Sequence, residues 1–332
     1  MNLDNGTRTR LLSYLNRFSE ATVLVVGDLM LDEYIFGHAS RISPEAPVPV
    51  VRAEKRTSGA GGAANVAANV RGLGVAAIVA GVVGDDQAGE QLVALLEKTG
   101  ARIDGIVSDP TRMTTIKTRV LAHHQQVVRV DSEARDPLSN ETATDIRKRI
   151  TNLEQADCII FSDYAKGMAN SPLISWLRES TKKCGTLLTA GPKPANVNHF
   201  SGFDFISLNV SEALDAAGLN PLAVTQLQEV GTSFAKQLGI QGLVITRSEN
   251  GASLFTNNGW ITDVSALRVP VFDVAGAGDT YLATLSLALW AGASFEDAAT
   301  LAGIAAAAVV RQVGVAVVTI QDITSLLNRA AV

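Results

Sequence analysis

Cysteines, aromatic residues and long apolar runs are all scarce in this chain of 332 residues. The two cysteines, Cys158 and Cys184, lie in apolar stretches typical of strands, and we expect reduced structural thiols in the cytoplasm. Residues 298–310 are apolar, but the run is too short to span a membrane and ends at Arg311. The N-terminal segment is polar and lacks a signal-peptide core. These absences predict a cytoplasmic protein with no membrane partner.

The chain also has no basic tract, and its net charge is −5. This charge balance excludes the electrostatic footprint of a nucleic-acid-binding protein. The histidines His38, His123, His124 and His199 show no metal-ligand spacing, so we expect no zinc site. Any anion bound by this chain must therefore be held by backbone N–H groups and a few well-placed cations.

Apolar residues make up 47% of the chain, and apolar strand-like runs alternate with helical stretches. This rhythm predicts one α/β domain over residues 1–332, with a mostly parallel central sheet covered by helices on both faces. The predicted strands are residues 22–27, 77–83, 158–162, 186–189, 205–208 and 243–246. The predicted helices are residues 1–20, 65–72, 88–99, 139–153, 171–184, 222–238, 280–291 and 295–313.

Two β-rich excursions, residues 34–51 and 113–130, interrupt that rhythm with rough polar and apolar alternation. They predict a small separate sheet, and a sheet of this size needs one face covered. We expect it to form a lid over the site and to make a homodimer contact. A plain edge hairpin is the alternative.

The stretch from Ser58 to Asn65 is rich in glycine. It matches the dinucleotide-binding fingerprint formally, but that fingerprint must follow a buried strand, and residues 52–57 are mostly charged or polar. We interpret it as a glycine pair that lets a ligand touch the backbone, with Asn65 offering a donor and an acceptor. The first strand ends at Gly27 without the fingerprint, which argues against a nicotinamide oxidoreductase.

Residues 276–279, Gly-Ala-Gly-Asp, precede a long stretch of small and apolar residues that predicts a buried helix. A glycine turn at a helix start gathers unpaired N–H donors and the positive end of the helix dipole, which together favour an anion. Asp279 is then either the N-cap of the helix or a general base beside a bound phosphate.

Polar residues follow several predicted strands, where ligands bind in open α/β sheets. They are Asp28 and Asp32, residues 163–167, 191–193, 209–212 and 247–251. Asn209 and Glu212 have the spacing of an N-cap with Glu at the third helical position. Their oxygens also suit water-mediated Mg²⁺ binding, and the two interpretations are compatible.

Taken together, these motifs resemble the ribokinase family of carbohydrate kinases, over residues 20–325. The resemblance rests on residues 27–32, 61–65, 83–86, 209–212 and 276–279. Residues 40–50, 162–167 and 246–249 further resemble the branch of that family that phosphorylates heptose 7-phosphate for ADP-heptose and lipopolysaccharide core synthesis. Relatives of that branch often carry a fused nucleotidyltransferase; here the sequence ends at Val332, so we expect a second enzyme to supply that step.

The resemblance implies a ribokinase-like fold, ATP as co-substrate, Mg²⁺, and phosphorylation of the anomeric hydroxyl of heptose 7-phosphate. It implies that Asp279 is the base and that the amides of Gly276, Ala277 and Gly278 hold the γ-phosphoryl charge. The implied nucleotide-binding residues are Lys193, Asn209, Val210, Ser211, Glu212, Arg247 and Gly251, with Asn209 and Glu212 also placing Mg²⁺ through water. The implied substrate-binding residues are Asp32, Gly61, Gly62, Asn65, Arg119 and Lys166, the last two for the phosphate of the substrate.

Two positions depart from the family pattern. Gly191 stands where the family usually has Asp before Pro-Lys, so a carboxylate near the metal is missing. Ala275 stands where the family has Thr, which removes one local hydrogen bond from the glycine loop. Another sugar or nucleoside kinase of this family remains an alternative, as does a non-catalytic sugar- or nucleotide-binding module.

Overall fold

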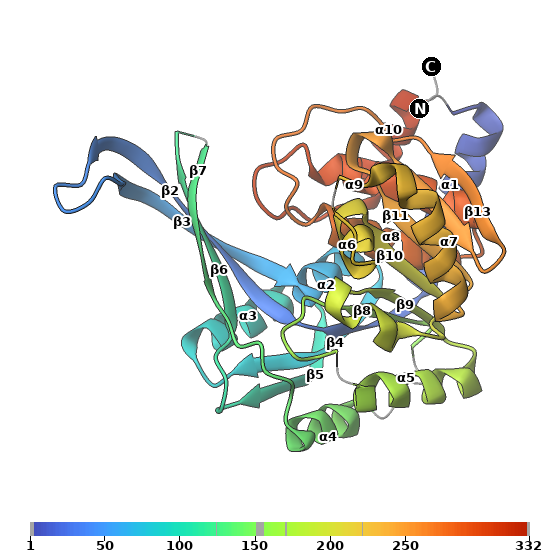
Figure 1. Ribbon diagram of the computed structural model, residues 1–332, viewed down its shortest axis with the longest axis horizontal. Helices are drawn as coiled ribbons and strands as arrows, with labels where there is room; N and C mark the ends of the chain where they lie inside the picture. The colour runs from blue at the N-terminus through green and yellow to red at the C-terminus, as the bar shows by residue number, and fades with distance from the viewer. Residues whose placement is uncertain (1–2, 124, 151–155, 170, 221, 331–332) are drawn as a thin grey trace.

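The computed structural model describes residues 3–123, 125–150, 156–169, 171–220 and 222–330. Its centre is a nine-stranded sheet (Figure 1). The strand order is β13 (Gly259–Val264), β12 (Ala252–Thr256), β11 (Gly242–Thr246), β10 (Phe205–Asn209), β9 (Leu187–Gly191), β8 (Cys158–Ser162), β1 (Thr22–Gly27), β4 (Ala76–Gly84) and β5 (Arg102–Asp109). All pairs from β11 to β5 are parallel, whereas β12 pairs antiparallel with both of its neighbours. The predicted mostly parallel sheet is confirmed.

Alternate residues of β1 show why helices cover both faces of this sheet. Val23 and Val25 face one apolar core, and Leu24 and Val26 face the other. The first core is covered by α1 (Asn5–Arg17), α2 (Ala63–Gly72), α3 (Gln87–Lys98), α8 (Ala277–Trp290), α9 (Phe295–Val309) and α10 (Ile320–Ala330). The second is covered by α4 (Asn140–Arg149), α5 (Ser171–Cys184), α6 (Val210–Ala216) and α7 (Leu227–Leu238). Short 3-10 turns follow α1, as η1 (Phe18–Glu20), and precede α7, as η4 (Val224–Gln226), whereas η3 (Pro194–Phe200) joins β9 to β10 and η5 (Ser248–Asn250) joins β11 to β12.

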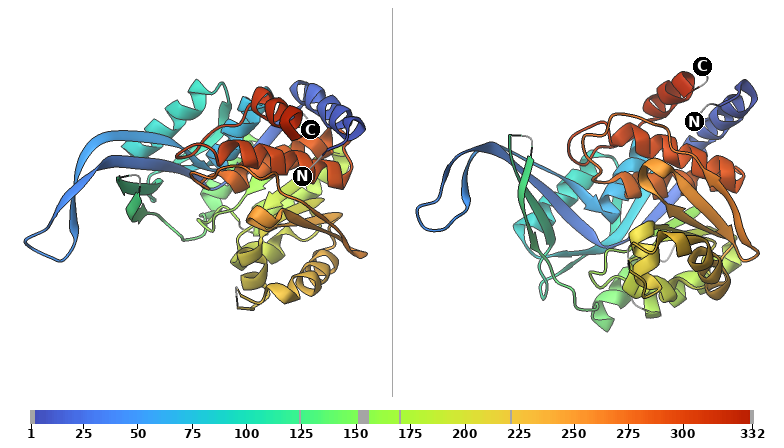
Figure 2. Two further views of the ribbon diagram at one scale, coloured as in Figure 1. Left: turned by 90° about the horizontal axis from the view of Figure 1, so that it is seen from above. Right: turned by 45° about the horizontal axis from the view of Figure 1, so that its top comes forward.

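A second sheet has four strands, in the order β3 (Pro49–Gly62), β2 (Leu29–Ile42), β6 (Thr115–Ala122) and β7 (Gln125–Ser132). Figures 1 and 2 show its β2–β3 hairpin as a long arm that projects from the body. Only Asp28 separates β1 from β2, so the chain passes directly from the central sheet into this one. This four-stranded sheet, called the lid below, is the separate sheet that the two β-rich excursions predict, rather than an edge hairpin.

Several predicted boundaries differ from the structure. Strand β3 continues through residues 52–57 to Gly62, and the charged stretch that argued against a strand lies exposed on the arm. Strands β5, β12 and β13 and helix α10 have no counterpart in the prediction. Helix α7 begins at Leu227 rather than at residue 222, and residues 151–153 of the predicted helix 139–153 lie outside the described residues.

One thiol also differs from its prediction. Cys158 is buried in β8, as expected, but Cys184 is exposed at the end of helix α5 and not in a strand. In the part of the chain that the structure describes, no helix combines the length and apolar character needed to cross a bilayer.

Candidate functional site

The carboxyl ends of the parallel strands meet at one edge of the central sheet. Gly27, Ser162 and Gly191, the last residues of β1, β8 and β9, are paired across it. The segments that follow these strands bring their polar side chains to this edge, as the sequence predicts. Open α/β sheets bind ligands at this edge.

Helix α8 begins at a glycine that no other residue can replace without strain. Gly276 is the N-cap, with φ 78° and ψ −4°, and a Cβ built on it would lie 2.7 Å from Nδ2 of Asn65. Asp279 is therefore the third helical residue, and no side chain of the described residues caps the start of α8. The N-cap interpretation of Asp279 is wrong, because two side chains from other elements hold its carboxylate instead.

Those two side chains bind one carboxylate oxygen each. Asn65 on α2 donates from Nδ2 to Oδ2 of Asp279 at 2.8 Å, and the Tyr164 hydroxyl donates to Oδ1 at 2.8 Å. The side chain is almost wholly buried, with 7% of Asp279 exposed. Burial raises the pKa of Asp279 to about 6, against the opposing effects of Asn65, Tyr164 and the nearby Lys193 charge. A carboxyl that titrates close to neutrality, beside a helix start, suits a proton acceptor.

The backbone amides at the start of α8 differ in whether they already donate a hydrogen bond. The Ala277 amide already donates to the Val274 carbonyl at 3.2 Å. In the described part of the chain, the Gly276 and Gly278 amides donate to no other group. Gly278 is exposed, and among the described residues a Cβ built on it would meet nothing within 4 Å. These two amides and the helix dipole favour an anion beside Asp279.

The loop before α8 is held by Asp273. Its Oδ1 accepts from the Ala275 amide at 3.0 Å, and its Oδ2 accepts from the Gly314 amide at 3.0 Å. The loop is thus tied to the segment that follows α9, without the threonine hydroxyl that Ala275 replaces.

A second asparagine, which the sequence analysis missed, supports Asn65 from behind. Asn69 donates to the Asn65 side-chain oxygen at 3.1 Å, and its own oxygen accepts from the Thr280 hydroxyl and the Val318 amide, both at 3.0 Å. Both asparagines are buried. The sequence could have indicated this role, because two asparagines four residues apart in a helix of mostly alanine and valine share one helix face.

Asp28 shapes the loop that carries Tyr164. Its carboxylate accepts from the amides of Tyr164 at 2.7 Å, Lys166 at 3.1 Å and Met168 at 3.1 Å. Burial, with the neighbouring charge of Asp163, raises the pKa of Asp28 to about 6. Asp28 therefore organises the backbone of this loop. Tyr164, which lies within residues 162–167, is a further residue of the candidate site, and the sequence did not single it out.

Lys193 connects this group to the start of α6. Its Nζ lies 2.5 Å from Oε1 of Glu212 and 4.7 Å from the centre of the Tyr164 ring. Asn209 and Glu212 form a capping box: the Glu212 amide donates to Oδ1 of Asn209 at 2.8 Å, and the Asn209 amide donates to Oε2 of Glu212 at 2.9 Å. The N-cap interpretation of this pair is confirmed.

The lid contributes a second charged pair. Arg119 on β6 is hydrogen-bonded to Oδ1 of Asp32 on β2, and its guanidinium lies 5.2 Å from the centre of the Tyr34 ring. Gly61 and Gly62 pack against this corner: a Cβ on Gly61 would lie 2.3 Å from Asp32, and Gly62 has φ 57°. Asp32 is close enough to Asp279 to raise its pKa.

Other predicted residues are occupied elsewhere. Lys166 pairs with Glu133 at 2.6 Å, and Arg247 pairs with Asp263 at 3.0 Å. Gly251 closes the turn with Arg247, whose amide donates to the Gly251 carbonyl at 2.6 Å. Among the described residues, these groups make no hydrogen bond or ion pair with Asp279. Val210 and Ser211 are the first residues of α6, after Asn209.

The described residues contain no group of three or more His, Cys, Asp or Glu side chains arranged to hold a metal ion. His124 lies outside the described residues.

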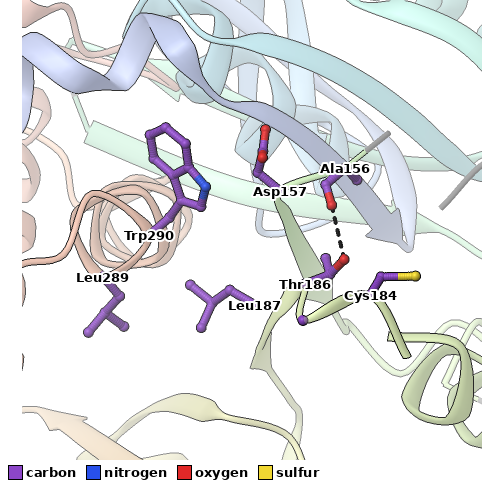
Figure 3. A pocket seen from close by; sticks show the side chains of 8 residues that line it. Ala156, Asp157, Cys184, Thr186, Leu187, Leu289 and Trp290 are labelled. Atoms are coloured by element: carbon purple, nitrogen blue, oxygen red, sulfur yellow. Dashed lines mark hydrogen bonds between the residues drawn. The ribbon is translucent and has the colours of Figure 1, made fainter. Parts of the chain in front are cut away.

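A separate cavity of about 360 Å³ lies at the other edge of the sheet (Figure 3). It is lined by Asp157, Thr186, Leu187 and Trp290 among others, from the amino ends of β8 and β9 and the last turn of α8. Because the start of α8 lies at the carboxyl edge, this cavity is not part of the site around Asp279.

Comparison with known proteins identifies related chains. The model of the pfkB family of carbohydrate kinases matches residues 20–321. "Bifunctional protein HldE" of Desulfatibacillum aliphaticivorans is 40% identical over 312 residues, which are 94% of this chain and 64% of that protein. The protein of the same name from Caulobacter vibrioides is 39% identical over 321 residues, which are 96% of this chain and 66% of that protein. The chain thus spans a little under two thirds of the length of these relatives.

Solved structures share the fold. Phosphofructokinase-2 of Escherichia coli, in complex with substrates and products, has a TM-score of 0.78 at 17% identity and covers 94% of this chain and 99% of its own. Ribokinase of Arabidopsis thaliana, complexed with ribose and ATP, has a TM-score of 0.73 at 19% identity and covers 92% of this chain and 98% of its own. At this identity the likeness shows the ribokinase-like fold alone.

Proposed function

Because this chain belongs to the pfkB family of carbohydrate kinases and is an ATP-dependent sugar kinase, we propose that its substrate is a heptose 7-phosphate. The reaction would phosphorylate the anomeric hydroxyl of D-glycero-β-D-manno-heptose 7-phosphate, for ADP-heptose and lipopolysaccharide core synthesis. The resemblance of residues 40–50, 162–167 and 246–249 supports this substrate, as does the similarity to proteins named HldE.

Asp279 is the base in this proposal. Its carboxylate takes the proton of the anomeric hydroxyl as the hydroxyl oxygen forms its bond to the γ-phosphorus and the bond to ADP breaks. The Gly276 and Gly278 amides and the dipole of α8 stabilise the charge on the transferred group. The Ala277 amide contributes less than its neighbours, because it already donates to Val274.

The sugar would lie between the body and the lid. Asp32 and Asn65 hold its hydroxyls, and Gly61 and Gly62 let it approach the backbone. Arg119, and Lys166 from the loop after β8, hold its distal phosphate. Support comes from the register of the lid: Lys117 lies opposite Asp32 and Arg119 lies opposite Tyr34, so both cations lie on the face that carries Asp32. Because Arg119 is paired with Asp32, and Lys117 with Asp131 and Glu133, an anionic substrate would have to exchange with these ion pairs.

The nucleotide would lie along the starts of α6 and α8. Lys193 meets its phosphates, and the other nucleotide-binding residues are Asn209, Val210, Ser211, Glu212, Arg247 and Gly251. Lys193 already pairs with Glu212, so a phosphate would exchange with or join an existing ion pair.

The residues present fit Mg²⁺ only in a water-mediated form. The Asn209 and Glu212 oxygens are partly committed to the capping box and to Lys193, and Gly191 supplies no carboxylate. Mg²⁺ keeps several waters in proteins and binds with few carboxylates beside nucleotide phosphates. When bound there, it would neutralise charge on the phosphates of ATP.

A single observation carries the proposal: a buried carboxylate, with pKa near 6, held by side chains beside free glycine amides at a helix start. We expect Asp279→Asn to lower kcat with ATP and heptose 7-phosphate by about 10²–10⁴-fold. Asp145→Asn on the surface of α4 is the matched control. A folded Asp279→Asn protein with near-normal turnover would exclude Asp279 as the base.

The same assay separates the alternatives. Ribose, fructose phosphate and adenosine in place of heptose 7-phosphate test the other kinase substrates. A non-catalytic binding module would release no ADP with any of these sugars, whereas the proposed kinase releases ADP with heptose 7-phosphate above the rate seen without it.

We also propose that two copies of the chain pair through the lid. Val128 and Val130 on β7 are 46% and 53% exposed, and Ile42 and Val48 on the arm are exposed as well. Large apolar side chains on a projecting sheet support a partner surface, and a second lid is the partner that this proposal commits to.

A further inference from the structure

We propose that Tyr164 is a positioning residue that keeps the Asp279 carboxylate ionised and aimed for proton transfer. This inference rests on the proposed function. Among the described residues, the Tyr164 hydroxyl is one of two donors to the Asp279 carboxylate; it comes from the loop after β8, whereas Asn65 comes from α2. The carboxylate is therefore fixed from two sides by elements that belong to different parts of the fold.

The loop leaves Tyr164 little freedom to move. Its amide is bound by Asp28 at 2.7 Å, and two further amides of the loop bind the same carboxylate. Ala165 has φ 54°, a conformation that residues other than glycine adopt rarely, and its amide donates to Oδ1 of Asp163 at 2.7 Å. These hydrogen bonds fix the backbone of the loop, so the phenol of Tyr164 is held in one position.

The ring of Tyr164 also faces the nucleotide side of the site. Nζ of Lys193 lies 4.7 Å from the ring centre, and the same Nζ is paired with Glu212. One side chain thus contacts both the proposed base through its hydroxyl and the proposed phosphate-binding lysine through its ring. The two contacts use different atoms, so they are separable by substitution.

The chemistry of the phenol decides its role. Burial and the charge of Asp279 hold the pKa of Tyr164 well above its ordinary value, so the phenol stays a donor at every working pH and is not itself a base. A donor to a carboxylate favours the ionised form, which opposes the effect of burial on Asp279. The titratable and charged groups that face Asp279 are Tyr164, Lys193 and Asp32; the first two favour its ionised form and Asp32 disfavours it.

Tyr164→Phe isolates the hydroxyl, because phenylalanine keeps the ring that lies against Lys193. We expect the acid limb of the kcat/KM profile to move up by about one pH unit, the effect of losing one hydrogen bond to a charged group. Activity at pH 6 falls about fivefold by the same measure, because half of the parent Asp279 but only about a tenth of the variant Asp279 is ionised there, and it recovers toward pH 8.5, while KM for ATP stays unchanged. Tyr14→Phe is the matched control, because Tyr14 on α1 donates its hydroxyl to Asp297 at 3.4 Å, away from the site.

A structural role for Tyr164 would give a different result. A Tyr164→Phe profile that superimposes on the unmodified profile, or that drops equally at every pH, overturns the inference. If the variant does not fold, difluorotyrosine at position 164 keeps the hydroxyl and shape but makes the phenol a stronger donor, and the acid limb should move down; a limb that does not move overturns the inference.

Asp279→Asn separates the two proposals: if that variant retains turnover, the proposed function fails, whereas loss of turnover with an unshifted Tyr164→Phe profile defeats only this inference.

Discussion

Two buried carboxylates at the same edge of the sheet, Asp28 and Asp279, show that burial and a raised pKa alone do not identify a candidate base. Asp28 and Asp279 both have a pKa raised to about 6, chiefly by burial. The donors to Asp28 are backbone amides of one loop, so that side chain organises the backbone. The donors to Asp279 are side chains, and free glycine amides lie at the same helix start. The identity of the donors, rather than the pKa, distinguishes the candidate base from the scaffold.

The raised pKa of Asp279 predicts how its replacement changes stability. Because the folded pKa lies above the unfolded one, the protonated carboxyl stabilises the fold below about pH 4, and this contribution is lost as the pH rises through about 6. At pH 7 we expect Asp279→Asn to be more stable than the parent by about 1–3 kcal/mol, since it removes a buried charge. The Tyr164 hydroxyl can rotate to accept from the new amide.

Urea unfolding at pH 4, 5.5 and 7 measures this effect. The free-energy difference between Asp279→Asn and the parent should shrink as the pH falls, and Asp145→Asn should show no such trend. A difference that grows toward low pH would contradict the assigned direction of the pKa shift.

At the scale of elements, α2 and α8 are joined by a buried polar contact inside an otherwise apolar packing. Asn69 on α2 accepts from Thr280 on α8 and from the Val318 amide before α10. The small side chains of α2 let the two helices approach, and the asparagine then sets how they are aligned. The position of Asn65 against Asp279 depends on that alignment.

Asn69→Ala tests this contact. It leaves a buried hydroxyl and a buried amide without an acceptor, so we expect the free energy of unfolding to fall by about 2–4 kcal/mol. Denaturant unfolding at pH 7 measures the loss, and Asn140→Ala at the exposed start of α4 is the control. A loss no larger than that of the control would mean that Asn69 does not align the helices.

At the scale of the whole molecule, the proposed site is divided between two sheets. The body supplies Asp279, Lys193 and the amides of α8, whereas the lid supplies Asp32 and Arg119. Since β2 follows β1 after one residue, the position of the lid is coupled to the edge of the central sheet (Figure 2). A substrate bound there would contact both the carboxyl edge of the central sheet and the lid, which are joined by the direct connection from β1 to β2.

The lid also carries the prediction on assembly. We expect the double variant Val128→Lys with Val130→Lys to be monomeric at micromolar concentration by light scattering, where the parent is a dimer, because lysines at these positions would meet across the proposed contact. Leu222→Lys, a change at an exposed apolar residue of the body, should leave the dimer intact. A parent chain that is monomeric under these conditions would contradict pairing through the lid.

Local patterns in the sequence were enough for much of the fold. The buried strands β1, β8 and β11 are largely apolar runs, and the polar segments after them had to meet at one edge once the sheet was parallel. The prediction ended this strand at residue 51, whereas β3 continues to Gly62, because the charged middle of β3 lies exposed on the arm. The prediction also lacked β12 and β13, which form a short antiparallel hairpin at the edge of the sheet. These elements depend on their neighbours more than on their own patterns.

By itself, the sequence determined that a glycine turn would open a buried helix, with Asp279 beside it. The tertiary structure alone decided which groups hold that carboxylate: Tyr164 is 115 residues away along the chain and Asn65 is 214 away. The physical reason is that hydrogen bonds between distant side chains depend on how helices and loops pack, whereas a glycine turn and an apolar helix are specified by residues that are adjacent in the chain.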